Sequence, residues 1–401
     1  MIIKPMIRNN ICLNSHPAGC AKGVGRQIAF ARSRAGISPP GAEPPRLILV
    51  IGCSTGYGLA SRIVGAFGYG AATIGVSLEK PGTSTRPGTP GFYNNRTFDA
   101  EALRRGLLSR TLNGDAFSEA LKEGAAEAVK DLASAQGIPP KIDLIIYSLA
   151  SPVRLDPKDG VLYRSVIKPI GQGYAGKTVD MMTGKFFVKS EEPATEEEIA
   201  HTVKVMGGED WEWWIDALDQ AGVLAPRVRT IAYTYLGPEL SWPIYKKGTL
   251  GRAKEDLERA ARALGQRLAK TGGNAWVSVN KAVVTRSSAV IPIIPLYVSC
   301  LFKVMKEKNL HEGCIEQMSR LFAERLYTPE VPTDPEGRIR LDDWEMREDV
   351  QQETIARMEA VTEATVFEAS DLAGFKQDFL EAHGFGIAGL DYEAAVDPAD
   401  L

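Results

Sequence analysis

Apolar residues in the first part of the chain form short continuous runs, separated by longer segments with a helical repeat. The run LILVIG at 47–52 is followed by LASRIVGAFG at 59–68, whose apolar positions recur with helical spacing. Continuous Ile, Leu and Val runs without alternating polar residues are typical of strands covered on both faces. Strands in strict alternation with helices predict right-handed crossovers, and therefore a parallel sheet.

This alternation continues as far as 275–285, with one interruption at 151–193, where Gly, Lys and Pro indicate an insertion. We find no repeat and no clear linker, so we predict a single elaborated α/β domain over 1–401. Its first dinucleotide-binding half is 46–150, its second half is 227–285, and 286–401 is mainly helical. The predicted strands are 47–52, 71–79, 111–115, 142–150, 227–235 and 275–285, and the predicted helices include 59–68, 100–108, 117–135, 209–222 and 250–270.

A glycine-rich turn, GCSTGYG at 52–58, directly follows the first predicted strand and opens a helix. A pyrophosphate approaches main-chain N–H groups at such a helix N-terminus, and a Cβ there would obstruct it. Because glycine turns are common, the alternative is a tight turn without a ligand; the strand–turn–helix context favours a dinucleotide site. The candidate cofactor-binding residues here are Gly52, Cys53, Ser54, Thr55, Gly56 and Tyr57.

Further cofactor candidates lie where the other strands end, because ligands bind beyond the carboxyl ends of parallel strands. Glu79 ends the second predicted strand, where a carboxylate accepts hydrogen bonds from ribose hydroxyls and repels a 2′-phosphate, which favours NADH over NADPH. The alternative for Glu79 is a surface carboxylate. Asp115 and Ala116 follow the third strand, at the expected adenine position, and Leu149 and Ala150 end the fourth, near the nicotinamide ribose.

A tyrosine and a lysine stand near the start of the long helix predicted after the fifth strand. Tyr245 and Lys254 form a Y-x8-K pair, and Gly248 lies between the tyrosine and the helix. A neighbouring ammonium is expected to lower the pKa of a phenol and so to favour proton donation. Tyr235, at the end of the fifth strand, is the better placed of two strand tyrosines to contact a substrate carbonyl; the alternative is a core tyrosine.

Composition excludes several other classes of function. The chain carries 47 Lys and Arg against 50 Asp and Glu, a net charge of −3, which gives no basic face for nucleic acid. Five cysteines without a C-x-x-C pair are typical of reduced thiols in a cytoplasmic protein. The apolar stretch 289–302 is too short and too broken by proline to span a membrane. The four histidines have no metal-binding spacing, so no metal is expected.

Many ordered sequence blocks resemble one family. They include VIGCSTGYGLASRI, NGDAFS, DLIIYSLASP, IKPIG, VMGGEDW, SWPIY with the Y-x8-K pair, KAVVT, IPIIPLY, LFKVMKEK and HEGCIEQ. Together they span nearly the whole chain, which is similar to the FabV-type trans-2-enoyl reductases of acyl carrier protein or coenzyme A thioesters. The resemblance implies a short-chain-dehydrogenase-like Rossmann core with large helical elaborations around the substrate, a single-chain monomer and NADH as the cofactor.

The resemblance also implies residue roles. Tyr245 is the implied proton donor, Lys254 binds the cofactor, and Tyr235 contacts the substrate. Residues Val283, Val284 and Thr285 are implied beside the nicotinamide, and Leu78 beside Glu79. Two residues depart from the family pattern: Cys53 stands in place of an alanine, and Leu78 in place of an aromatic residue.

The expected reaction is reduction of the C2=C3 bond of a trans-2-enoyl thioester by NADH, as in the last step of fatty-acid elongation. We expect the hydroxyls of Tyr245 and Tyr235 to bind the thioester oxygen, and the stretch 289–301 to line the acyl tunnel. Two alternatives stay open: another short-chain-type oxidoreductase acting on a carbonyl, and a non-catalytic NADH sensor. The chain lacks the Y-x-x-x-K motif that is expected of the first alternative.

Overall fold

A seven-stranded sheet, with strand order β13-β12-β11-β6-β3-β4-β5, forms the centre of the protein. The structure is a computed structural model that describes residues 1–8, 11–35, 43–285 and 294–399. All strand pairings in this sheet are parallel. The strand order reverses between β3 and β6, so the topological switch point lies at the carboxyl ends of these two strands. The strands are β3 (Leu47–Ile51), β4 (Ala72–Ser77), β5 (Ser109–Asn113), β6 (Ile142–Tyr147), β11 (Leu224–Thr234), β12 (Asn274–Val279) and β13 (Ile339–Arg340).

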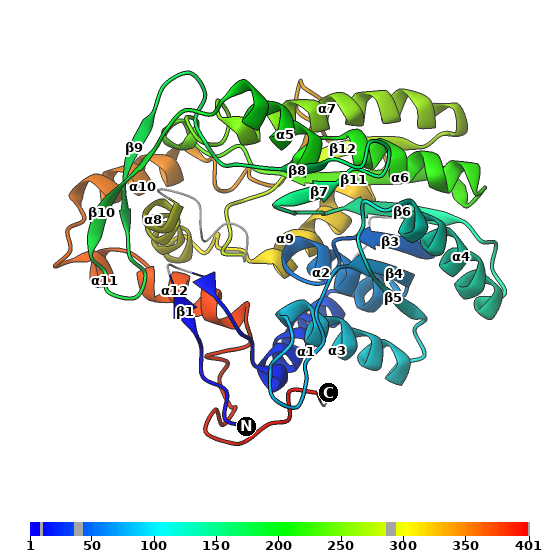
Figure 1. The fold of residues 1–401 in the computed structure, drawn as a ribbon, viewed down its shortest axis with the longest axis horizontal. Coiled ribbons are helices and arrows are strands. Elements are labelled where there is room, and N and C mark those ends of the chain that lie inside the picture. The colour runs from blue at the N-terminus through cyan, green and yellow to red at the C-terminus, as the bar shows by residue number, and fades with distance from the viewer. Residues whose placement is uncertain (9–10, 36–42, 286–293, 400–401) are drawn as a thin grey trace.

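Helices cover both faces of the sheet (Figure 1). Successive side chains of β3 point to opposite faces, so Leu49 and Ile51 enter one core and Ile48 and Val50 the other. This explains why the strand is apolar at every position. The first face is covered by α4 (Glu119–Gln136), α6 (Glu209–Gln220) and α7 (Thr249–Leu268); the second by α1 (Pro17–Ser33), α2 (Gly56–Ile63), α3 (Pro90–Arg104) and α9 (Cys314–Arg320).

A third core lies beside the sheet, around the apolar helix α8 (Ile294–Glu307), on the left in Figure 1. It is enclosed by α10 (Glu348–Ala360), α12 (Leu372–Glu381) and a hairpin of β9 (Tyr174–Val179) and β10 (Phe186–Glu191). The predicted insertion 151–193 is therefore two β-hairpins. The remaining elements are β1 (Ile7–Arg8), β2 (Ile11–Cys12), β7 (Val153–Leu155), β8 (Leu162–Arg164), α5 (Glu196–Met206) and α11 (Val366–Ala369), with 3₁₀ turns at Glu239–Ser241 and Ala269–Thr271 and π-helical turns at Val64–Gly68 and Leu321–Leu326.

The doubly wound parallel sheet confirms the predicted fold class, but several element bounds were wrong. The helix predicted at 100–108 begins at Pro90, because proline is favoured in the first helical turn. The third strand is two residues earlier than predicted, and the strand predicted at 275–285 ends at Val279. Tyr235 lies just after β11. Helix α1 and strand β13 were not predicted.

We predict that Trp214 is a major stabilising residue of the first core. Its side chain is fully buried and its indole N–H donates to the Ala116 carbonyl at 3.1 Å. Trp214→Ala is expected to lower the free energy of unfolding by about 3–5 kcal/mol, measured by urea denaturation followed by circular dichroism. Trp213→Ala is the control, because Trp213 is half-buried and packs against the cations of Arg154 and Lys158. Equal losses in the two variants would contradict the prediction.

Candidate active site

A cavity of about 860 Å³ lies at the carboxyl ends of the sheet strands. Residues that follow β3, β4, β5, β6, β11 and β12 line it, as expected for a ligand site at the switch point of a parallel sheet. The helices of the third core close its other side, through Ile294 and Val298 of α8 and Phe379 of α12. Of the stretch 289–301 that was predicted to line an acyl tunnel, residues 289–293 lie outside the described part of the chain.

The glycine turn joins β3 to α2 as predicted, and its glycines are sterically required. Gly52 has φ +86°, and a Cβ there would lie 2.3 Å from the Ser148 carbonyl oxygen at the end of β6. A Cβ on Gly58 would lie 1.9 Å from the Gly52 oxygen, and Gly56 has φ +55°. The first turn of α2, with its N–H groups that lack helical partners, therefore borders the cavity.

Two predicted cofactor residues do not line this cavity. The Cys53 thiol is fully buried, with its Sγ 3.6 Å from Asn95 Oδ1, behind the glycine turn. Val284 packs instead against the core around α8. The other predicted residues do line the cavity: Gly52, Ser54, Thr55, Gly56, Tyr57, Leu78, Glu79, Asp115, Ala116, Leu149, Ala150, Tyr235, Tyr245, Lys254, Val283 and Thr285.

Glu79 is held in place by its neighbours. Ser54 Oγ donates to Glu79 Oε1 at 2.6 Å, and the Asn113 amide group pairs with both the N–H and the carbonyl of Glu79. The side chain is only 9% exposed, whereas that of Leu78 is 71% exposed. The carboxylate therefore has one orientation at the cavity wall, which agrees with a binding role better than with a free surface carboxylate.

Tyr245 lies in the turn before α7, and Lys254 lies within the early turns of this helix, as predicted. A Cβ on Gly251 would lie 2.0 Å from the Lys246 carbonyl oxygen, so glycine allows this turn to pack directly on the helix. Lys254 Nζ donates to the Tyr233 carbonyl at 3.3 Å. The rings of Tyr235 and Tyr245 meet edge to face, with centroids 5.0 Å apart.

The electrostatics of the pair differ from the expectation. Burial raises the pKa of Tyr245, and the charge of Glu345 raises that pKa further. Burial also lowers the pKa of Lys254 from 10.5 to about 8. Both shifts follow from the loss of solvent around an ionisable group. Tyr245 is therefore a protonated phenol at neutral pH, and the prediction of an acidified phenol was wrong.

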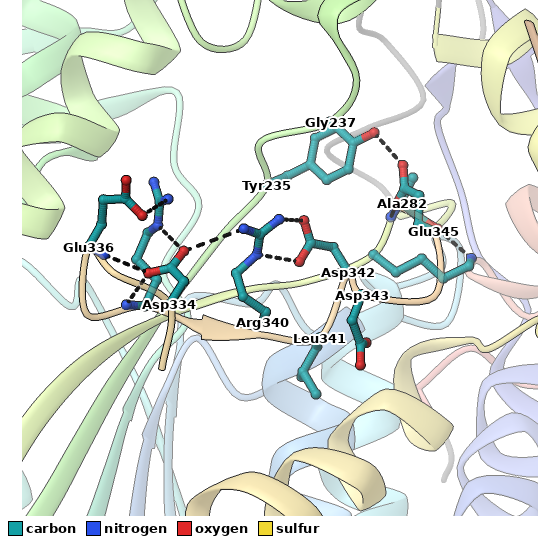
Figure 2. Close-up of polar contacts among 12 residues, drawn as sticks. Tyr235, Gly237, Ala282, Asp334, Glu336, Arg340, Leu341, Asp342, Asp343 and Glu345 are labelled. Carbon is teal, nitrogen blue, oxygen red and sulfur yellow. Dashed lines mark hydrogen bonds and ion pairs between the residues drawn. The ribbon is translucent and has the colours of Figure 1, made fainter. Parts of the chain in front are cut away.

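Sequence reasoning missed Glu345, which lies between β13 and α10 and is fully buried. The Tyr235 hydroxyl donates to its Oε1 at 2.8 Å, as Figure 2 shows, so the proton of this O–H is already engaged within the protein. Burial raises the pKa of Glu345. The surrounding sequence LDDWEMRED is simply acidic, and nothing local marks this one carboxylate.

Comparisons with known proteins agree with this geometry. A family model described as the trans-2-enoyl-CoA reductase catalytic region matches residues 86–327, and its NAD(P)H binding domain matches residues 2–84. The chain is 55% identical to the trans-2-enoyl-CoA reductase [NADH] of Treponema denticola, with complete coverage of both chains.

The chain belongs to the trans-2-enoyl-CoA reductase family. It is also 53% identical to the enoyl-[acyl-carrier-protein] reductase [NADH] of Saccharophagus degradans, over 99% of this chain and 98% of that one. The crystal structure of the Treponema denticola enzyme in complex with NAD superposes with a TM-score of 0.93, covering 99% of this chain and 98% of that chain. The family recognised from the sequence motifs is thereby confirmed.

A third family model, described as an enoyl reductase FAD binding domain, matches residues 333–396. The described residues of this segment do not fit a flavin site. Strand β13 is followed by LDDWEMR, and the glycine-rich stretch GFGIAG at 384–389 follows α12 rather than a strand. Neither is the strand–turn–helix that a dinucleotide pyrophosphate needs. The segment contributes only Phe379 and His383 to the large cavity. We derive no flavin chemistry from it.

The remaining candidate features are few. Among the described residues, no group of three or more His, Cys, Asp or Glu side chains is placed to hold a metal ion. None of the helices in the described part of the chain is long and apolar enough to cross a membrane.

The buried amine of Lys254 predicts a pH-dependent stability. Below about pH 8 the Lys254 amine is charged in both the folded and the unfolded state, and the folded state bears the cost of its desolvation. Between pH 8 and 10.5 the amine stays protonated only in the unfolded chain. The free energy of unfolding therefore rises with pH across this range. Lys254→Met is expected to raise the Tm at about pH 7, and this advantage should shrink toward pH 10. The exposed Lys247→Met is the control. A constant Tm difference across this range would contradict the burial of a charged amine.

Proposed function

We propose that this protein reduces the C2=C3 bond of trans-2-enoyl thioesters with NADH. The observation that carries the proposal is one cavity lined by the glycine turn, by Glu79 and by the group of Tyr235, Tyr245 and Lys254. Apolar residues of α8 and α12 form the opposite wall. A dinucleotide site, a phenolic proton donor and an apolar wall are the three parts that this reaction needs.

The cofactor position follows from the strand ends. The N-terminus of α2 is placed to bind the pyrophosphate, Glu79 the adenosine ribose, and Asp115 with Ala116 the adenine. Leu149 and Ala150 would border the nicotinamide ribose, which Lys254 would bind, and Val283 and Thr285 would contact the nicotinamide. When bound, NADH supplies the hydride that adds to C3 of the substrate.

Hydride addition places negative charge on the thioester oxygen. The Tyr245 hydroxyl is placed to hydrogen-bond this oxygen, a contribution worth about 2.7–4 kcal/mol to the transition state. Its raised pKa keeps the proton on the phenol at neutral pH, so Tyr245 holds a proton to give. Because the Tyr235 O–H is engaged by Glu345, Tyr235 lines the cavity without supplying a second donor to this oxygen.

The finer assignments belong to the same proposal. The carrier is coenzyme A or acyl carrier protein, because relatives named for each are similarly close in sequence. We place the enzyme in the cytoplasm, supported by a sequence of five cysteines without a C-x-x-C pair, which is typical of reduced thiols. We infer that it acts as a monomer, as the resemblance to the family implies; analytical ultracentrifugation tests this.

Incubation with NADH and crotonyl-CoA separates the main proposal from its alternatives. An enoyl reductase consumes the absorbance of the reduced nicotinamide with crotonyl-CoA but not with simple ketones. A carbonyl reductase shows the reverse preference, and an NADH sensor binds NADH without turnover. A chain-length series on both carriers then defines the substrate class.

Tyr245 is the residue whose loss should affect chemistry most directly. Tyr245→Phe removes one hydroxyl and is expected to lower kcat with crotonyl-CoA by roughly 10²- to 10³-fold, the effect of removing one oxyanion donor. Stopped-flow or steady-state absorbance measures this, and thermal unfolding checks the fold. Tyr163→Phe is the control, because Tyr163 lies in β8 and donates to Asp159 outside the cavity. A folded Tyr245→Phe enzyme with wild-type turnover would exclude the proton-donor role.

Glu79 is expected to determine cofactor choice. Glu79→Ala removes the carboxylate that repels a 2′-phosphate, so the ratio of kcat/KM for NADPH to that for NADH should rise at least about tenfold, or 1.4 kcal/mol. The control is Glu101→Ala, on α3, where Glu101 pairs with Arg104 and Arg105 instead. An unchanged cofactor ratio would contradict the assignment of Glu79 to the ribose.

A further inference from the structure

The buried carboxylate of Glu345, which is not one of the predicted site residues, hydrogen-bonds to three separate segments of the chain around the cavity. Glu345 follows β13 and precedes α10, and its side chain is fully buried. It does not line the cavity. Its partners lie far away in the sequence, at the end of β11, in the loop after β12 and on α8.

Three donors converge on this carboxylate. Oε1 accepts from the Tyr235 hydroxyl at 2.8 Å and from the Tyr297 hydroxyl at 2.7 Å. Oε2 accepts from the backbone N–H of Ala282 at 2.7 Å. Figure 2 shows Tyr235 and Ala282 approaching the carboxylate from different segments of the chain. Charge-assisted bonds of this length are the stronger class of protein hydrogen bonds.

The direction of each bond is determined by the neighbours. Gln351 Nε2 donates to the Tyr297 oxygen at 3.1 Å and to the Glu345 carbonyl at 2.7 Å, so the Tyr297 hydroxyl is left to donate. A backbone N–H can only donate. Lys281 Nζ donates to the Ala282 carbonyl at 2.7 Å, so both backbone polar groups of Ala282 are hydrogen-bonded. The positive charge of Lys281 also lowers the cost of ionising Glu345.

The segments held by Glu345 are the ones that the proposed reaction must align. Tyr235 packs edge to face on Tyr245, with ring centroids 5.0 Å apart, so the orientation of one phenol constrains the other. Ala282 lies in the loop after β12 and, with Val283 and Thr285 of the same loop, lines the cavity wall. A displacement of about 1 Å between a donor group and a reacting bond costs a large part of the rate.

We propose that Glu345 is a positioning residue of this active site: its carboxylate holds the Tyr235 phenol and the Ala282 backbone together, and so aligns the substrate side of the cavity with the nicotinamide side. This inference rests on the proposed function. It assigns the 333–396 segment a role in positioning the reductase site in place of flavin binding. Glu345 acts through Tyr235 and Ala282 and does not itself touch substrate.

The test compares Glu345→Gln with a matched change in the same segment. A carboxamide has one acceptor oxygen instead of two, so one of the three donors loses its partner. We expect kcat/KM for crotonyl-CoA with NADH to fall about 10- to 100-fold, mainly through kcat. The control is Asp342→Asn, because Asp342 is equally buried but binds Arg340, at 2.7 Å through two bonds, and not the active-site tyrosine (Figure 2). It should stay within about threefold of wild type.

A double-mutant cycle separates positioning from a general structural role. Tyr235→Phe removes the hydroxyl that Glu345 holds. If Glu345 acts through Tyr235, the kcat/KM of the double variant should lie within about threefold of that of the less active single variant. Independent effects would instead lower kcat/KM by the product of the two single losses. Glu345→Asp provides a second variant if Glu345→Gln does not fold: it keeps the charge but is one methylene shorter, so we expect roughly a tenfold loss.

The outcomes are distinct. A wild-type enzyme without activity on crotonyl-CoA would overturn the proposed function. An active wild type together with a folded Glu345→Gln or Glu345→Asp variant within threefold of it would overturn only this inference. Losses that multiply in the cycle, or an equal loss in Asp342→Asn, would assign Glu345 a structural role instead.

Discussion

The close contact between the glycine turn and the end of β6 is the constraint on which the site depends. Gly52 lies against the Ser148 carbonyl, and Gly58 lies against Gly52, at distances that leave no room for a Cβ. This contact brings the N-terminus of α2 to the switch point between β3 and β6. Since the strands are parallel, their remaining carboxyl ends open at the same edge, and the side chains that follow them share one cavity.

Burial determines how that cavity is charged. Tyr245 and Lys254 line the cavity and Glu345 lies buried behind it, and the pKa of each is shifted toward its neutral form. For Tyr245 this keeps the proton in place until charge develops on a substrate. For Lys254 it creates an amine whose charge is costly to desolvate. Desolvation of these groups therefore lowers the free energy of unfolding, but it arranges the electrostatics of the site before the substrate binds.

The parts of this arrangement that were predictable have local signals. The run at 47–52 is apolar throughout, and the run at 142–150 is mainly apolar, because both faces of their strands are covered. The glycine turn has a strand before it and a helix after it. From these, the topology placed Glu79 and Asp115 at one edge. Helix α1 had no such signal, because Gly19, Gly23 and Gly25 interrupt its apolar pattern while tertiary packing stabilises it. Strand β13 is two residues long.

What could not be predicted depends on contacts between distant segments. Tyr235 and Glu345 are 110 residues apart, and neither has a neighbour in sequence that indicates the other. The direction of the Tyr245 pKa shift likewise depends on burial by α8 and its surroundings rather than on the nearby lysine. Because the third core supplies both the apolar wall and, through Glu345 and Tyr297, the anchor of the Tyr235 phenol, the C-terminal helices complete the catalytic geometry that the sheet begins.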